Sequence, residues 1–393
     1  MRILLITDHH TKAGGAELYF FELKERLKKV QGIQVYSLGF GPHAEEGPDH
    51  FVLKGLKTNS TKFIWQLLFH PFIYFKLKKK IKEIKPDVIH LHHAKQYSVS
   101  LLKAIAPYPI VQTIHDYGVI CPVAYNIHKD LTPCPTGFRF ACCFQHQVKY
   151  AKIFYLPLVY AFLKLRNRLR KSVKKFIAPS PMLVSYLKNN QFDDVSYIPP
   201  FKKERNHYSF ERMLPHHFFF AGQLSQHKGV HILIDEFALA MQSNKQLTLT
   251  IAGKGPDELI LKNKISDLGL EKNISLIGWQ DDLNNEYEQC IAVIFPSLWL
   301  EAFGLVMTEA MSHARPIIGS NRGSPTWLID DHQTGFIFNP SKRGDLAEKI
   351  LLLANDMDLA KRLGAEGYHK LKNSFNNEES LKKILTLYRD VKN

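Results

Sequence analysis

The chain has 393 residues, of which 45% are apolar and 23% charged, a balance that excludes a disordered chain and favours two globular domains. Residues 1–200 hold 29 Lys and Arg against 13 Asp and Glu, a net charge of +16, whereas the remainder carries −1. This asymmetry indicates an anionic partner for the first half, such as a membrane surface, a nucleic acid or a phosphorylated substrate.

The apolar segments are all short. The first, Ile3–Ile6, is too brief for a signal peptide, and the uncharged stretches Phe63–Phe75 and Ile153–Leu163 are too brief to cross a bilayer. We therefore expect a protein that is cytoplasmic or bound to the face of a membrane.

Short β-branched or aromatic runs alternate with amphipathic stretches along the first half. Such alternation is typical of βαβ units around a parallel sheet. The expected strands are Ile3–Ile6, Val88–Leu91, Ile110–Ile114 and Phe176–Ala178, with helices such as Glu17–Val30 and Ile64–Ile84 between them.

The alternation stops at Tyr197–Pro200 and restarts after Pro215, which predicts a linker. The second half is expected to form strands at Phe218–Ala221, Leu247–Ala252, Ile274–Ile277, Ala292–Phe295, Pro316–Gly319 and Thr334–Phe338, followed by helix from Asp345 to Asn393. The predicted fold is α/β with two Rossmann-like, doubly wound domains: residues 1–199, a linker at 200–214, residues 215–375, and a C-terminal helix at 376–393 that packs back on the first domain.

Glycine-bearing loops follow several of these strands. Gly14-Gly15 opens the first helix, and Gly222 and Gly253 each follow a strand of the second domain. Glycines at such places let backbone N–H groups approach a phosphate, although a tight turn explains Gly14-Gly15 equally well. Lys228 comes shortly after Gly222 and suits a diphosphate, with a solvated surface lysine as the alternative.

Three further polar residues lie where a ligand is expected. His115 follows a strand end, which in an α/β fold faces the ligand crevice, although a buried hydrogen-bonded histidine is the alternative. Glu301 precedes a helix, and Glu309 lies within the apolar run of that helix. Two acids flanking exposed helix amides suit a ligand with hydroxyls at both ends and a phosphate between them.

Taken together and in order, these motifs resemble the retaining family 4 glycosyltransferases of the GT-B fold. The resemblance spans nearly the whole chain and is most specific in the second half, where Glu301 and Glu309 match the family's pair of acids separated by seven residues. It implies an acceptor-side first domain, a nucleotide-sugar-binding second domain and a donor site in the cleft between them.

The resemblance also implies roles for individual residues. Gly14, Gly15 and Lys228 would face the donor diphosphate, His115 would approach the donor sugar, and Glu301 would bind the sugar hydroxyls. Glu309 would bind the ribose hydroxyls, and backbone N–H groups would meet sugar or phosphate at Phe303, Gly304 and Leu305. Gly222, Gln223 and Gly253 would line the donor site.

Three departures from the family pattern concern this donor site. Gln223 stands where the family often has an arginine, and Ala302 stands where proline is common. Arg322-Gly323-Ser324-Pro325-Thr326 replaces a frequent Gly-Gly-x-x-Glu loop, and Arg322 is a candidate for the missing positive charge.

The expected reaction is transfer of a glycosyl group from a nucleoside-diphosphate sugar to a saccharide or lipid-linked acceptor, in cell-surface polysaccharide or glycolipid synthesis. The resemblance implies retention of anomeric configuration without a covalent enzyme intermediate, the departing diphosphate taking the acceptor's proton. No Asp-x-Asp motif lies in a suitable loop, so we expect no metal and no other cofactor. Uridine, guanosine and adenosine donors all remain open.

Two other classes of function fit parts of the sequence. A nucleotide-sugar epimerase or phosphorylase would share the two-domain architecture. A non-catalytic membrane- or nucleic-acid-binding protein would explain the basic first half, although nucleic-acid motifs are missing and we expect no nucleic-acid partner.

Cysteines and basic residues cluster in the first half. Cys121, Cys134, Cys142 and Cys143 fall within a short stretch, whose spacing favours a loop with free thiols over a zinc site. Residues Gln147–Phe176 join the apolar run Ile153–Leu163 to nine cations and no acid, and Lys76–Lys85 follows an aromatic run. The cations of the longer stretch are Lys149, Lys152, Lys164, Arg166, Arg168, Arg170, Lys171, Lys174 and Lys175. We expect these stretches to dock on an anionic membrane, with ordinary domain helices as the alternative.

Overall fold

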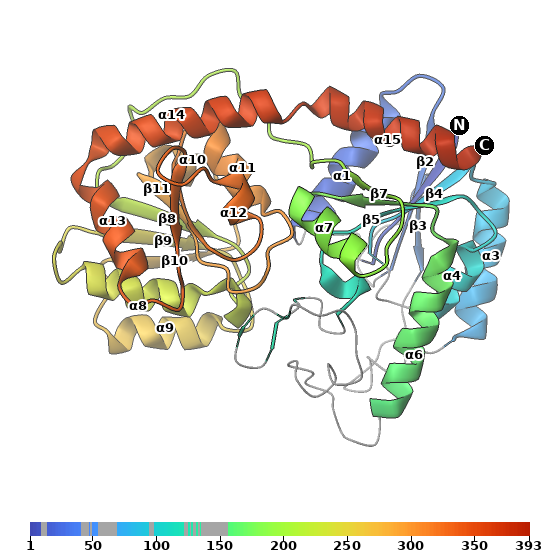
Figure 1. The fold of residues 1–393 in the computed structure, drawn as a ribbon, viewed down its shortest axis with the longest axis horizontal. Coiled ribbons are helices and arrows are strands. Elements are labelled where there is room, and N and C mark those ends of the chain that lie inside the picture. The colour runs from blue at the N-terminus through green and yellow to red at the C-terminus, as the bar shows by residue number, and fades with distance from the viewer. Residues whose placement is uncertain are drawn as a thin grey trace. The chain divides into compact units, whose positions relative to one another are not determined.

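The computed structural model describes residues 1–8, 14–40, 47, 49–53, 69–93, 98–121 and 156–393, with positions 125, 127, 128, 131, 132 and 134. These residues form two compact units, each with its own parallel sheet (Figure 1). Unit 1 comprises residues 1–129, 134–201 and 377–393, and unit 2 comprises residues 130–133 and 202–376. The two Rossmann-like domains predicted from the alternation are therefore present.

Unit 1 contains a seven-stranded sheet in the order β3-β2-β1-β4-β5-β6-β7, parallel throughout. Strand order reverses between β1 and β4, the point at which doubly wound sheets bind ligands. The strands are β1 (Arg2–Ile6), β2 (Gln34–Phe40), β3 (His50–Leu53), β4 (Val88–Leu91), β5 (Ile110–Thr113), β6 (Lys175–Ala178) and β7 (Val195–Tyr197).

Helices cover both faces of this sheet. One face carries α3 (Pro71–Ile84), α4 (Ser98–Ile105) and α6 (Leu156–Leu169), and the other carries α1 (Gly15–Lys28) and α15 (Asn377–Lys392) (Figure 1). The short helix α7 (Pro181–Asn189) packs beside β6 and β7 at the end of the sheet. The last helix packs Ile384 and Tyr388 into the same core as Phe20 and Leu23 of α1. The end of the chain thus completes the core of unit 1. Of the helix expected at Ile64–Ile84, residues 64–68 lie outside the described residues.

Unit 2 contains a six-stranded parallel sheet in the order β10-β9-β8-β11-β12-β13, which reverses between β8 and β11. The strands are β8 (His217–Ala221), β9 (Thr248–Ala252), β10 (Ile274–Gly278), β11 (Ala292–Phe295), β12 (Ile317–Ser320) and β13 (Gly335–Phe338). Each lies within a residue or two of the segment predicted from its apolar run.

Two apolar cores lie on the two faces of this sheet. One is formed with α8 (Val230–Ala240), α9 (Glu258–Asp267) and α13 (Asp345–Asn355), and the other with α10 (Asn284–Gln289), α11 (Leu305–Ser312) and α12 (Pro325–Leu328) (Figure 1). Helix α14 (Met357–Ser374) contributes its first half to the former core and Leu371 to the latter. The helical stretch expected from Asp345 onward is thus three helices, interrupted at Asp356 and again at Phe375-Asn376.

Residues 202–213, called the strap from here on, follow unit 1 in the chain and pack on unit 2. Met213 is buried in the core that contains α8, and Phe210 packs against that core. The stretch expected as a linker is therefore bound to unit 2 along most of its length.

Candidate active site

Lys228 and Glu301 meet at the reversal point of the unit 2 sheet. Lys228 ends a short 3-10 helix, Gln226–Lys228, that follows β8, and Glu301 follows β11. The Nζ of Lys228 lies 2.7 Å from Oε2 of Glu301, with 19% and 8% of the two side chains exposed. The two strands whose ends flank the ligand-binding point of such a sheet thus bring an acid and a base into contact.

The same carboxylate oxygen accepts two more hydrogen bonds. Trp299 Nε1 donates to it at 2.9 Å and Ser297 Oγ donates at 3.2 Å. The Lys228 ammonium also lies 5.2 Å from the centre of the Trp299 ring, within cation–π range. Oε2 of Glu301 is therefore saturated by protein donors.

Two glycines permit the close backbone approach that brings Lys228 and Glu301 together, a pair called the Lys228–Glu301 centre from here on. Gly229, directly after Lys228, has φ +73°, and a Cβ there would lie 2.0 Å from the carbonyl oxygen of Pro296. Gly323 has φ +79°, and a Cβ there would lie 2.2 Å from the backbone nitrogen of Glu301. Any side chain at either position would push Lys228 or Glu301 away.

Beside this centre, α11 begins with unpaired amides. Gly304 precedes the helix with φ +83°, and no described residue accepts a hydrogen bond from the N–H groups of Phe303, Gly304 or Leu305. The carbonyl of Phe303 accepts from Ser324 Oγ at 2.6 Å, which fixes this turn. Free amides at the positive end of a helix favour an anion.

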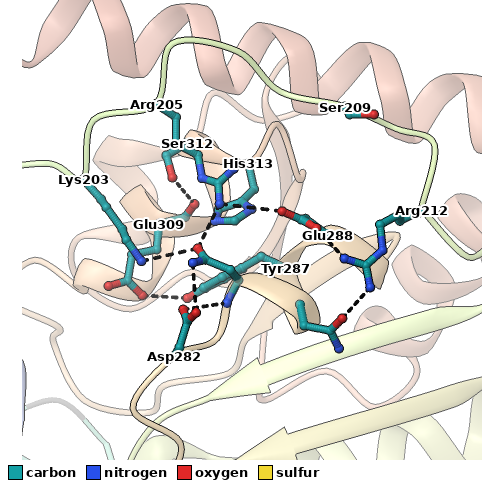
Figure 2. Close-up of polar contacts among 12 residues, drawn as sticks. Lys203, Arg205, Ser209, Arg212, Asp282, Tyr287, Glu288, Glu309, Ser312 and His313 are labelled. Atoms are coloured by element: carbon teal, nitrogen blue, oxygen red, sulfur yellow. Dashed lines mark hydrogen bonds and ion pairs between the residues drawn. The ribbon is translucent and has the colours of Figure 1, made fainter.

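Glu309 lies further along α11 and is half-buried. Its Oε2 accepts a hydrogen bond from the hydroxyl of Tyr287 at 2.8 Å (Figure 2). Burial raises the pKa of Glu309 above its usual range, while the Tyr287 hydroxyl and the charge of Lys203 act in the opposite direction. A helix face open to solvent, the ordinary interpretation of such a residue, does not apply here.

The glycine loops after β8 and β9 pack on each other. The N–H of Leu224 donates to the carbonyl of Lys254 at 3.0 Å, and a Cβ at Gly253 would lie 1.8 Å from the carbonyl oxygen of Gly222. Packing alone therefore requires Gly253, and a role for Gly222 and Gly253 in donor binding stays a prediction. Gln223, between them, is exposed.

In unit 1 the predicted residues lie at the ends of β1 and β5. Gly14 precedes α1 and Gly15 begins it, while His115 follows β5. The Nε2 of His115 lies 3.0 Å from Nδ1 of His92, directly after β4, and the ring packs against Tyr19. The reversal point of this sheet is thus lined by His92 and His115.

Sequence profiles for known families match both units. The profile "Glycosyltransferase Family 4" matches residues 13–201, and "Glycosyl transferases group 1" matches residues 205–370. The chain belongs to the family 4, group 1 glycosyltransferases. This confirms the family expected from the motifs, and no comparison supports an epimerase, a phosphorylase or a non-catalytic nucleic-acid-binding protein.

Relatives and solved structures agree with this assignment. The glycosyltransferase is 24% identical to O-antigen chain mannosyltransferase C of Escherichia coli over 99% of this chain and 98% of that protein. It is 24% identical, over 80% and 78%, to an E. coli UDP-Gal:alpha-D-GlcNAc-diphosphoundecaprenol alpha-1,3-galactosyltransferase.

Among solved structures, sucrose-phosphate synthase from Thermosynechococcus elongatus matches with a TM-score of 0.78 at 20% identity, covering 99% and 98% of the two chains. Anabaena HepE in complex with UDP matches at 0.69 and 19%, covering 99% and 100%. These structures confirm the GT-B fold.

Two residues near the site, Tyr287 and His92, were not predicted from the sequence. Tyr287 lies in a short polar helix without a motif, so the sequence offers no signal for it. His92 belongs to the segment His90–His93, in which the repeated histidines at a strand end are a signal that could have found it. His93 lies 3.8 Å from Glu17 and 3.7 Å from Asp116, so more titratable groups gather there than predicted.

Arg322 lies in the loop after β12. Its guanidinium donates to Ser341 Oγ at 3.3 Å, and no described acid pairs with it. Its neighbour Gly323 forms a bridge with Glu301, so the loop, rather than the arginine side chain, contacts the acid. A diphosphate contact by Arg322 stays a prediction.

The described residues contain no group of three His, Cys, Asp or Glu side chains arranged to hold a metal. Cys121 and Cys134 are buried, whereas Cys142 and Cys143 lie outside the described residues. No helix within the described ranges has the length and apolarity needed to cross a membrane.

The basic stretch at Gln147–Phe176 is only partly described. Residues 147–155, with Lys149 and Lys152, lie outside the described part of the chain. Arg170 is buried and donates to the carbonyl of Val119 at 2.8 Å, and Lys175 pairs with Asp194. Arg170 is therefore not available to a membrane surface, contrary to expectation.

Proposed function

We propose that this glycosyltransferase transfers a sugar from a nucleoside-diphosphate sugar with retention at the anomeric carbon. The ion pair between Lys228 and Glu301, next to the free amides of α11, carries the proposal. An ammonium and helix amides suit a diphosphate, and carboxylates suit sugar hydroxyls. On this assignment Lys228 binds the diphosphate, Glu301 the donor sugar and Glu309 the ribose.

The ion pair favours an exchange of partners when the donor binds. The donor diphosphate takes over Lys228, and Oε2 of Glu301 keeps the hydrogen bonds from Trp299 and Ser297. Burial and the adjacent Lys228 charge lower the pKa of His227 to about 3, which leaves this neighbouring imidazole neutral. Lys228 is thus the cation that stabilises the leaving group.

The proposed step needs no covalent enzyme intermediate. The bond from the anomeric carbon to the diphosphate oxygen breaks while the acceptor oxygen bonds to that carbon on the same face. The acceptor's proton passes to the departing diphosphate, so charge and atoms balance. In unit 1, we assign His115 to the donor sugar and the amides of Gly14 and Gly15 to the diphosphate, with Arg322 of unit 2 as a further diphosphate cation.

We also propose that the transfer requires no metal ion, because Lys228 and the α11 amides supply positive charge where the diphosphate would lie. Full activity in excess EDTA supports this proposal. Activity that EDTA abolishes and Mg²⁺ or Mn²⁺ restores contradicts it.

The names of the relatives favour a cell-surface acceptor. One is named an O-antigen chain mannosyltransferase, and another is named a galactosyltransferase for a diphosphoundecaprenol-linked sugar. We propose that the glycosyltransferase likewise builds a surface polysaccharide or glycolipid on a lipid-linked or saccharide acceptor.

The outer face of α3 supports docking on an anionic membrane. The helix buries Ile73, Leu77 and Ile81, whereas Phe72 and Phe75 are 75% and 65% exposed. Exposed Lys76, Lys79 and Lys82 follow at helical spacing and so share the face of these rings. Exposed aromatic rings among lysines are typical of a segment lying in a headgroup layer.

Vesicle co-sedimentation tests this docking. We expect the unaltered protein to bind anionic vesicles at low salt and to bind them more weakly at high salt. The double variant Phe72→Ser/Phe75→Ser should bind more weakly than the unaltered protein at low salt. The matched control is Leu259→Ser/Ile260→Ser on α9, whose side chains are 69% and 64% exposed. If both double variants co-sediment with anionic vesicles to the same extent as the unaltered protein, a role for α3 is contradicted.

The transfer itself is tested with purified protein, candidate UDP-, GDP- and ADP-sugars and lipid-linked or saccharide acceptors. We expect a glycoside whose anomeric configuration, read by proton NMR, equals that of the donor. A glycoside of inverted configuration contradicts retention. Free sugar isomers or sugar phosphates, without a glycoside, contradict transfer.

A further inference from the structure

Tyr287 of α10 is packed so that its hydroxyl points at one atom. Its side chain is almost fully buried, and its ring lies edge-on to Phe219 at 5.2 Å between centres and stacks on His313 at 4.9 Å. The hydroxyl donates to Oε2 of Glu309 at 2.8 Å (Figure 2). Two rings therefore fix the direction of this hydrogen bond.

The other oxygen of Glu309 is left for a ligand. No described residue donates a hydrogen bond to Oε1. Two groups lower the pKa of this carboxylate, the neutral hydroxyl of Tyr287 from α10 and the charge of Lys203 from the strap. His313, directly after α11, is neutral because burial, followed by the charges of Arg205, Arg315 and Lys203, lowers its pKa to about 3.

The strap holds α10 in place from outside (Figure 2). Arg212 lies 2.7 Å from Glu288 and also donates to Asn285, while Arg205 donates to Asn284 at 2.9 Å. Buried Arg315 joins the two segments, donating to the carbonyls of Glu288 at 2.7 Å and Ser209 at 3.1 Å. The short helix that carries Tyr287 thus depends on the strap.

We infer that Tyr287 is a positioning residue of the donor site, which holds Oε2 of Glu309 so that Oε1 faces a hydroxyl-bearing ligand. The strap keeps α10, and with it Tyr287, in register. The identity of the ligand rests on the proposed function, whereas the coupling of Tyr287 to Glu309 does not.

The coupling has a consequence for titration. A hydroxyl donor stabilises a carboxylate more than a carboxylic acid. Burial raises the pKa of Glu309, and the Tyr287 hydroxyl lowers it. Tyr287→Phe must therefore raise the pKa of Glu309 further, and its cost to folding must grow as pH rises through that pKa.

A double-mutant cycle without ligand tests the coupling. Urea unfolding of the full chain, Tyr287→Phe, Glu309→Gln and the double variant is compared at several pH values between about 4 and 8. We expect the stability loss from Tyr287→Phe to increase with pH in the unaltered chain and to be independent of pH beside Glu309→Gln. The same loss at every pH in both backgrounds overturns the inference.

Nucleotide binding tests the positioning. UDP and GDP are titrated into the same variants by calorimetry, with Tyr108→Phe as control because this tyrosine belongs to unit 1 and lies outside the strap, α10 and α11. We expect Tyr287→Phe to weaken nucleotide binding about five- to tenfold. As the pH is lowered, this variant should lose its affinity at a higher pH than the unaltered protein does. Tyr108→Phe should keep the original affinity and pH profile.

The outcomes separate the two proposals. Unchanged affinity and pH profile in Tyr287→Phe overturn the positioning role. If neither nucleotide binds the unaltered protein, the proposed donor fails, and the ligand-free cycle still decides whether Tyr287 sets the ionisation of Glu309.

Discussion

The ammonium of Lys228 lies 2.7 Å from Oε2 of Glu301, and this contact joins the loops that follow β8 and β11. Both side chains are largely buried, so neither charge is well compensated by water. Without ligand each is the main counter-charge of the other. A bound anion would compete with Glu301 for Lys228, which makes the pair the natural place to perturb the enzyme.

Lys228→Ala should lower turnover by about two to three orders of magnitude, because it removes the cation assigned to the leaving diphosphate. Steady-state kinetics with the identified donor and acceptor measure this effect. Lys264→Ala is the matched control, since its ammonium also lies 2.7 Å from a carboxylate, that of Asp235, but on the surface. Full turnover in Lys228→Ala would move the diphosphate cation elsewhere, with Arg322 the next candidate.

Glu309→Ala should weaken nucleotide binding by about 1–3 kcal/mol, because ribose hydroxyls would lose their acceptor. Calorimetric titration of the nucleotide measures the loss. The exposed Glu271→Ala controls for removing a glutamate charge from unit 2. Unchanged affinity in a folded Glu309→Ala protein would exclude this residue from the site.

Gly229→Ala and Gly269→Ala separate backbone strain from crowding. Both glycines have positive φ, +73° and +65°, but only at Gly229 would the new Cβ strike the Pro296 carbonyl, whereas nothing lies within 4 Å at Gly269. We expect Gly269→Ala to cost about 1–2 kcal/mol in unfolding free energy and Gly229→Ala about 1–3 kcal/mol more. Equal losses of unfolding free energy in the two variants, measured by urea denaturation, would show that the loop after Lys228 moves to accommodate the new Cβ without cost.

His90 should make the glycosyltransferase sensitive to acid. Burial lowers the pKa of His90 to about 3. Between about pH 6.5 and 3, His90 is therefore protonated in the unfolded chain but not in the folded chain. Stability should therefore fall with falling pH over that window, by up to about 1.4 kcal/mol per pH unit from this residue alone. Urea unfolding of His90→Gln between pH 7 and 5 should show a smaller slope, and an unchanged slope would refute this explanation.

Apolar runs predicted the sheet because parallel strands are buried on both faces. Ala292–Phe295 is an uninterrupted apolar run and coincides with β11, and Val88–Leu91, in which only His90 is polar, coincides with β4. By contrast, β2 mixes Gln, Ser and Gly with apolar residues, and β3 has only four residues, so neither stands out by periodicity. Pairing with β1 and β2 makes strands of these segments, and pairing is not visible locally.

Motifs located the acids and the lysine because such residues follow strand ends at family spacing. They did not show that Lys228 and Glu301 touch, because that contact depends on Gly229 and Gly323 bringing separate loops together. The role of Tyr287 could not be predicted from the sequence for the same reason. Its partner Glu309 is 22 residues away, and the packing of α10 on α11 brings the two side chains together.

The central claim is that the Lys228–Glu301 centre holds a nucleoside-diphosphate sugar, and ligand-induced thermal shift tests it without an acceptor. UDP-, GDP- and ADP-sugars are screened against the unaltered protein and Lys228→Ala. We predict that one nucleotide class raises the melting temperature by about 2 °C or more, and that Lys228→Ala loses most of this shift. No shift with any donor, or an equal shift in both proteins, would contradict the claim.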